Sequence, residues 1–292
     1  LLAPIVYFFG RNFYLMHLVL VFLGYLSLFF FYQIFKRYSD RKIAFFIILF
    51  LATNWIFIIY STLYILSENP YLFFSGLTLF MAIRYMGKQS PFSKEGLLVI
   101  FGLILSCFTR YIGLTLFLGI MASLLLTPKE DKVKFKKIIF FGSSFLIVFA
   151  IWQVSKSLNL IPVVSYPKQL FLIDPLVPDK GSIFTHPLYF IIRFIEGVNY
   201  YYRVLGDVFF LSLFRKCYFL RDLLSSFILV IMFLGLWFKF QEYKNGVLHY
   251  YFLFYFLFII CLPFREEIRF ILPILPFIFF YFVIGLRKIL SF

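Results

Sequence analysis

The stretch YLMHLVLVFLGYLSLFFFYQIF, residues 14–35, decides the fold of this chain. It holds no Asp, Glu, Lys or Arg, and Lys36 and Arg37 follow it directly. A helix of about 20 apolar residues is long enough to cross the hydrocarbon core of a bilayer. The stretch therefore predicts a membrane-spanning helix with a basic flank at its carboxyl end.

The composition extends this interpretation to all 292 residues. Hydrophobic residues make up 63% of the chain and charged residues 14%, whereas a soluble domain has about 45–50% apolar and about 25% charged residues. This excludes a cytosolic enzyme, a secreted disulfide scaffold and a disordered protein. Because backbone in lipid must satisfy its own hydrogen bonds, we expect an all-α polytopic transmembrane helical bundle that forms a single domain over residues 1–292. About nine spans are expected, at residues 14–35, 43–64, 70–86, 95–109, 111–127, 137–156, 223–240, 247–264 and 270–287.

The basic residues indicate which side of the membrane each loop faces. Sixteen of them fall in one set of loops, and the opposite short loops hold only Arg11, Arg110, Arg265 and Arg269. The positive-inside rule makes the first set cytoplasmic, so Leu1 is expected outside. No basic block is set among stacking aromatic residues, so the net charge of +15 predicts contact with membrane lipids and no nucleic-acid partner. The sixteen are Lys36, Arg37, Arg41, Lys42, Arg84, Lys88, Lys94, Lys129, Lys132, Lys134, Lys136, Lys137, Lys239, Lys244, Arg287 and Lys288.

The long segment 157–222 is expected on the outer side. It mixes aromatic and aliphatic residues with charged ones, which is typical of helices that lie in the membrane interface. Its run Tyr200-Tyr201-Tyr202 fits simple anchoring at the interface or contact with a substrate. The three cysteines and three histidines show no spacing typical of a metal site, so neither a metal nor a cofactor is expected.

Three short polar clusters lie at outer ends of the predicted spans: Ser67-Glu68-Asn69-Pro70, Phe108-Thr109-Arg110-Tyr111-Ile112-Gly113, and residues 265–276. Each has a plain structural explanation. Glu68 suits the amino end of the next helix, Arg110 suits an anchor among lipid headgroups, and residues 265–276 suit a charged loop before a proline-kinked helix. Ionisable side chains between apolar helices are also costly enough to mark a functional site, so both interpretations stay open.

Taken together, these clusters resemble the GT-C superfamily of integral-membrane glycosyltransferases, which use a polyprenyl-phosphate sugar as donor. The resemblance is to bacterial lipid A and lipopolysaccharide-core sugar transferases, protein O-mannosyltransferases and GPI mannosyltransferase-like proteins. Three motifs carry it, and the opening Pro4…Phe9-Gly10…His17 resembles the family's helix after its first outer loop. The motifs are Tyr60-Ser61…Ser67-Glu68-Asn69-Pro70-Tyr71-Leu72-Phe73, Thr109-Arg110…Gly113-Leu114 and Glu267-Ile268-Arg269-Phe270…Pro273…Pro276.

The resemblance implies transfer of a hexose or pentose, with inversion, to a lipid, glycan or protein acceptor at the outer face of a bacterial inner membrane. It implies that Arg110 and Arg269 bind the donor phosphate and that Glu266 and Glu267 support Arg269. Glu68 would belong to the catalytic centre, either supporting the base or orienting the acceptor. The family's principal catalytic carboxylate, usually Asp, precedes the matched region, so we expect it upstream of Leu1 in a segment missing from this chain.

Other classes of membrane protein compete with this interpretation. A transporter or flippase for a lipid-linked sugar would often show repeated halves with broken helices at the midplane, and no internal repeat is visible. An O-antigen-type polymerase would carry more Arg in its outer loop. A non-catalytic membrane scaffold is the third alternative.

Overall fold

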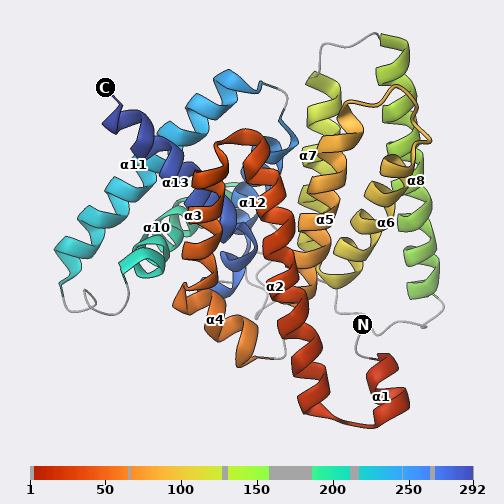
Figure 1. Cartoon of the computed structure of the whole chain (residues 1–292), viewed down its shortest axis with the longest axis horizontal. Helices are drawn as coiled ribbons and strands as arrows, with labels where there is room; N and C mark the ends of the chain where they lie inside the picture. Colours follow the sequence, from red (N-terminus) through yellow and green to blue (C-terminus); the bar gives the residue numbers. More distant parts are fainter. Residues whose placement is uncertain are drawn as a thin grey trace.

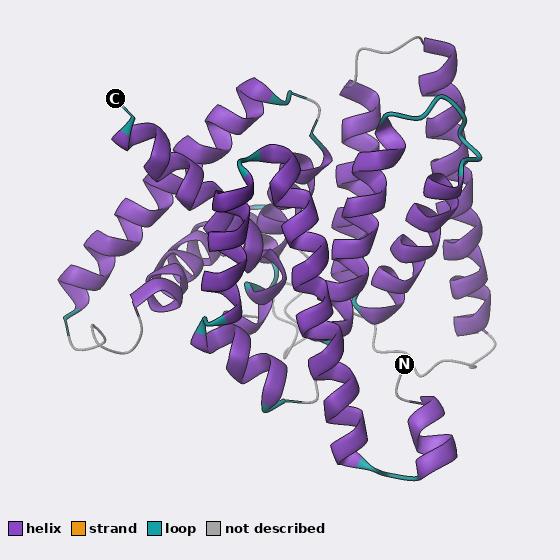
Figure 2. Cartoon of the chain, in the orientation of Figure 1, coloured by secondary structure: helices purple, strands orange, loops and turns teal. Residues whose placement is uncertain are grey.

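The computed structural model describes residues 3–64, 67–126, 131–157, 186–210, 217–244, 246–263 and 267–291. All regular elements within these ranges are helical, as predicted (Figure 2). The α-helices are α1 (Ala3–Phe9), α2 (Phe13–Tyr38), α3 (Arg41–Ala52), α4 (Trp55–Thr62), α5 (Glu68–Met86), α6 (Lys94–Thr109), α7 (Leu114–Leu126), α8 (Asp131–Ser157), α10 (Leu188–Phe210), α11 (Tyr218–Glu242), α12 (Val247–Cys261) and α13 (Leu275–Leu290). Short 3₁₀ helices are η1 (Tyr111–Gly113), η4 (Glu267–Phe270) and η5 (Leu272–Ile274).

The helix lengths do not support the expected count of about nine spans. Among the described residues, three helical stretches are long and apolar enough to cross a membrane: Phe13–Tyr38, Phe219–Glu242 and Ile268–Leu290. The bent pair α3 and α4 makes a fourth if the two count as one span. Other predicted spans form shorter helices, since α6 has 16 residues, α7 has 13 and α12 has 15.

A local polar residue explains one interruption, and the backbone conformation of Arg110 explains the boundary predicted between spans 95–109 and 111–127. The side-chain Oδ1 of Asn54 accepts hydrogen bonds from the amides of Ile56 (3.0 Å) and Phe57 (3.4 Å), so it caps α4 and splits the predicted span 43–64. The two halves meet at an angle of 56°. Arg110 has an extended backbone, with φ −152° and ψ 137°, which ends α6 before η1 begins.

The core is built on α13, which crosses the centre of the bundle (Figure 1). In the stretch Ile268–Leu290, which contains α13, 72% of the apolar segment is buried, and Phe280 stacks on Phe35 of α2 with ring centroids 4.7 Å apart. Against α11 the packing is backbone to backbone, because a side chain on Gly235 would collide with the carbonyl oxygen of Tyr281 and one on Gly285 with that of Ile231. Small residues of this kind let apolar helices approach closely.

Basic side chains that the sequence analysis predicts on the cytoplasmic side lie together at one end of the bundle. Arg287 Nη1, near the end of α13, lies 2.5 Å from Asp40 Oδ2 at the turn between α2 and α3. The Nζ atom of Lys137 in α8 donates to the carbonyl oxygens of Tyr85 (3.2 Å) and Lys88 (2.5 Å) at the end of α5. These ends lie at the top of the view in Figure 1. The cytoplasmic orientation of this end stays a prediction.

The predicted outer segment 157–222 falls partly outside the described residues, which leave out 158–185 and 211–216. Within it, α10 packs against α11 and α12. Its Arg193 is only 7% exposed, whereas Ile191 and Ile195 are 55% and 61% exposed. An outward side formed by aliphatic residues suits contact with lipid. The interfacial position of this helix stays a prediction.

The close crossing of α11 and α13 predicts a stability difference between two leucine substitutions. Gly235→Leu should lower the melting temperature of the detergent-solubilised protein, because overpacking costs about 1–3 kcal/mol. Gly142→Leu in α8 is the matched control, since a Cβ there meets nothing within 4 Å. Thermal unfolding of both variants checks this, and equal melting temperatures would contradict the packing described here.

Candidate functional site

The first turn of α5 holds Glu68 in a fixed position. Asn69 Nδ2 donates to the carbonyl oxygen of Ser61 (3.2 Å), and Ser61 Oγ donates to Asn69 Oδ1 (3.2 Å). On the other side, a Cβ at Gly24 of α2 would lie 3.1 Å from Asn69 Cγ. Pro70 is tolerated because amides in a first helical turn have no intrahelical acceptor. This turn is therefore clamped between α2 and α4.

Arg110 reaches the same place from the break between α6 and α7. Its amide donates to the carbonyl oxygen of Ser106 (2.9 Å), and its own carbonyl oxygen accepts from the amide of Gly113 (2.9 Å). A Cβ at Gly113 would stand 2.8 Å from the backbone nitrogen of Cys107. Only glycine fits at position 113, because the chain turns back there against the backbone of α6. The spacing between Arg110 and Gly113 therefore has a structural explanation.

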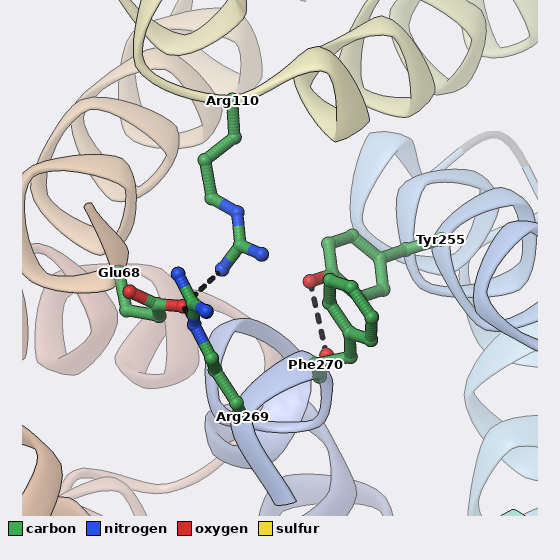
Figure 3. Close-up of polar contacts among 5 residues, drawn as sticks. All are labelled: Glu68, Arg110, Tyr255, Arg269 and Phe270. Atoms are coloured by element: carbon green, nitrogen blue, oxygen red, sulfur yellow. Dashed lines mark hydrogen bonds and ion pairs between the residues drawn. The ribbon is translucent and has the colours of Figure 1, made fainter. Parts of the chain in front are cut away.

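Arg269 comes from the short helix η4, which precedes η5 and α13. The Tyr255 hydroxyl donates to the carbonyl oxygen of the next residue, Phe270, at 3.0 Å (Figure 3). Pro273 lies in η5 and Pro276 in the first turn of α13, and both are buried. Two prolines this close favour short 3₁₀ turns over a continuous helix, because each removes a backbone donor.

The three side chains meet in one group, which we name the ion cluster: Glu68, Arg110 and Arg269. Glu68 Oε1 accepts a hydrogen bond from Arg110 Nη1 at 2.6 Å and another from Arg269 Nε, as Figure 3 shows. The exposed fraction of the side chain is 0% for Glu68, 11% for Arg110 and 32% for Arg269. One carboxylate between two guanidinium groups leaves the cluster with a formal charge of +1.

The second oxygen of the carboxylate is the unusual feature of the cluster. Glu68 Oε2 is buried and has no hydrogen-bond partner within the described residues. Most buried polar atoms in folded proteins have a partner, so an orphan acceptor calls for an explanation. A donor from a bound molecule would satisfy it.

Aromatic side chains line one side of the ion cluster. The Cζ atom of Arg110 lies 5.2 Å from the centroid of the Phe270 ring, a cation–π distance. Beyond Tyr255, the hydroxyls of Tyr71 and Tyr251 lie 3.2 Å apart. Tyr71 belongs to the first of the three family-like motifs, but sequence reasoning missed Tyr251 and Tyr255 because they lie inside an apolar run. The spacing of Tyr251 and Tyr255, four residues apart on one helix face, was the only available signal.

The structure brings together three of the five predicted site residues. Glu266 lies outside the described residues, and of Glu267 only the backbone at the start of η4 is described. Their predicted support of Arg269 stays a prediction. Among the described residues, no three His, Cys, Asp or Glu side chains gather in a way that would hold a metal ion.

The arrangement is suited to binding an anion. Arg110 has a single side-chain hydrogen bond within the described ranges, to Glu68, which leaves other N–H groups of its planar fork for a ligand. Guanidinium groups match phosphate oxygens in geometry and stay charged.

No protein-family model, no curated protein and no solved structure matches this chain. The resemblance to the GT-C superfamily therefore stays a prediction.

The ion cluster predicts that Glu68→Gln strongly destabilises the protein. The amide keeps the shape but removes the carboxylate charge that both guanidinium groups share, and breaking a buried ion pair costs about 3–5 kcal/mol. The partial exposure of Arg269 moves the expected cost to the lower end of this range.

Glu95→Gln is the matched control for Glu68→Gln. Glu95 pairs with Lys88 at 2.9 Å, where the side chains are 23% and 50% exposed, and such surface pairs contribute little. Thermal unfolding in detergent should show a clear drop in melting temperature for Glu68→Gln alone. Matching curves for the two variants would mean that the cluster does not hold its elements together.

Proposed function

We propose that the protein is a membrane glycosyltransferase that moves a sugar from a polyprenyl-phosphate donor to a lipid, glycan or protein acceptor. The observation that carries this proposal is the ion cluster. Each of the three motifs that resemble the GT-C superfamily contributes one charged residue to the cluster. Arg110 and Arg269 lie 42 and 201 positions from Glu68 in the sequence, yet both donate to the same oxygen atom of its side chain. Residues that met only by chance of composition would not be expected to converge on one carboxylate.

The arginines suit the leaving group of this reaction. Cleavage of the sugar–phosphate bond builds negative charge on the departing polyprenyl phosphate, and fixed cations lower the energy of that transition state. Arg110 and Arg269 would bind this phosphate. The +1 charge of the cluster favours an anion, and Arg269, at 32% exposure, is the member most open to a ligand.

Glu68 suits a positioning role. A carboxylate oxygen that accepts from two guanidinium groups fixes the angle at which both arginines face a ligand. The orphan Oε2 atom would accept a hydrogen bond from a sugar or acceptor hydroxyl.

The position of the ion cluster fits transfer on the non-cytoplasmic face of a bacterial inner membrane. The cluster lies at the start of α5 and the end of α6, whereas the Lys and Arg residues at the opposite ends of these helices share the basic end. If the basic end faces the cytoplasm, as the positive-inside rule requires, the cluster opens toward the periplasm or exterior.

Arg269→Ala tests the proposal. In proteoliposomes, wild-type protein should transfer radiolabelled sugar from at least one of a panel of synthetic polyprenyl-phosphate sugars, and Arg269→Ala should lower transfer by at least about 100-fold, as loss of a transition-state contact does. Arg287→Ala, at the other end of α13 and 57% exposed in its side chain, should keep wild-type activity.

Two results would contradict the glycosyltransferase proposal. One is full transfer by Arg269→Ala, which would remove the arginine from the reaction. The other is movement of the labelled donor across the bilayer without transfer, which would favour a flippase. Melting temperatures of both variants, measured in parallel, separate loss of activity from loss of folding.

A further inference from the structure

The backbone carbonyl of Phe270 lies where a proline removes its usual hydrogen-bond donor. In a 3₁₀ helix a carbonyl oxygen accepts from the amide three residues later, and in an α-helix from the amide four residues later. Three residues after Phe270 comes Pro273, which has no amide hydrogen. Four residues after it comes Ile274, whose amide donates to the carbonyl oxygen of Ile271 at 2.9 Å. The Phe270 carbonyl therefore needs a donor from another part of the chain.

Tyr255 of α12 supplies that donor. Its side chain is buried, and its hydroxyl donates to the Phe270 carbonyl oxygen at 3.0 Å (Figure 3). The Tyr255 ring packs edge-on against Tyr251, one helical turn earlier, with centroids 5.8 Å apart, and it lies 6.4 Å from the ring of Tyr71 in α5. The hydroxyls of those two neighbours are within 3.2 Å of each other. The donor is thus held in place by packing against two helices.

Phe270 connects this hydrogen bond to both arginines of the ion cluster. Arg269 is its neighbour in the chain, and the centroid of its ring lies 5.2 Å from Cζ of Arg110. A displacement of the Phe270 backbone would move the attachment point of one guanidinium group and the aromatic ring that contacts the other. Because both guanidinium groups donate to Glu68 Oε1, the geometry of the whole ion cluster depends on where Phe270 lies.

We propose that Tyr255 is a positioning residue for the phosphate site of the ion cluster. This inference rests on the proposed function, in which Arg110 and Arg269 bind the donor phosphate. Tyr255 acts without touching the ligand: its hydroxyl fixes the Phe270 carbonyl, and Phe270 sets the positions of the two guanidinium groups. Cations that are already in place bind a phosphate more tightly than cations that must be ordered on binding, because ordering side chains costs entropy.

Tyr255→Phe tests this role, because it removes the hydroxyl and keeps the ring. Equilibrium binding of a labelled, sugar-free polyprenyl phosphate to the whole chain in detergent should be about fivefold weaker, the equivalent of one net hydrogen bond. Tyr281→Phe is the matched control, since Tyr281 is equally buried and its hydroxyl lies 2.7 Å from Nδ1 of His249, outside the ion cluster. Both variants lose one buried hydrogen bond, so their melting temperatures should fall by similar amounts, whereas Tyr281→Phe should bind as wild type does.

A second comparison tests whether the hydroxyl acts through the Phe270 carbonyl. Pro273→Ala gives residue 273 an amide hydrogen, which can donate to this carbonyl oxygen three residues earlier. In the Pro273→Ala background, Tyr255→Phe should weaken polyprenyl-phosphate binding by less than about twofold, because the carbonyl then has a second donor. Such non-additivity is what a double-mutant cycle measures. Equal weakening by Tyr255→Phe in both backgrounds would overturn the proposal.

The results separate this inference from the proposed function. Saturable binding by wild type together with unchanged binding by Tyr255→Phe would overturn the positioning role alone, and so would equal weakening by Tyr281→Phe. Lack of saturable binding by wild type would overturn the proposed function and this inference with it. If Pro273→Ala does not fold, the comparison of Tyr255→Phe with Tyr281→Phe decides the matter.

Discussion

The burial of one carboxylate, Glu68, is the constraint on which the rest of the structure depends. A charged side chain removed from water is costly unless it is paired and hydrogen-bonded, and Glu68 is 0% exposed. Its counter-ions come from two distant parts of the chain, the break after α6 and the short helix η4. The fold must therefore bring α5, α6 and the approach to α13 to one point.

Other features of the molecule serve this convergence. Asn69 fastens the first turn of α5 to α4, Gly113 allows the tight return after Arg110, and Tyr255 fastens the backbone beside Arg269. At the opposite end, Lys137 binds the carbonyl oxygens at the end of α5. The contacts of Asn69, Tyr255 and Lys137 are hydrogen bonds inside an apolar bundle, where an unpaired polar group would cost free energy. Both ends of α5 are thus fixed, and Glu68 is held rigidly.

The sequence predicted helices, the gathering of basic residues at one end, and the three charged residues that form the ion cluster. Composition and the spacing of Lys and Arg carry that information directly. The span count was not supported, because hydropathy does not register Asn54 capping a new helix within the predicted span 43–64. The division predicted at Arg110, between spans 95–109 and 111–127, is present in the structure. The pairing of Glu68 with both arginines and the tyrosines beside them depends on tertiary contacts between residues far apart in sequence, which local patterns do not specify.

The most direct test of the account is the binding of a polyprenyl phosphate that carries no sugar, because the central claim is that the ion cluster recognises phosphate. Equilibrium binding of such a labelled lipid would be compared between wild-type protein and R110Q/R269Q in the same detergent. The account predicts saturable binding by wild type and loss of most of it in the double variant. Equal binding by both proteins, with R110Q/R269Q still folded, would contradict the claim.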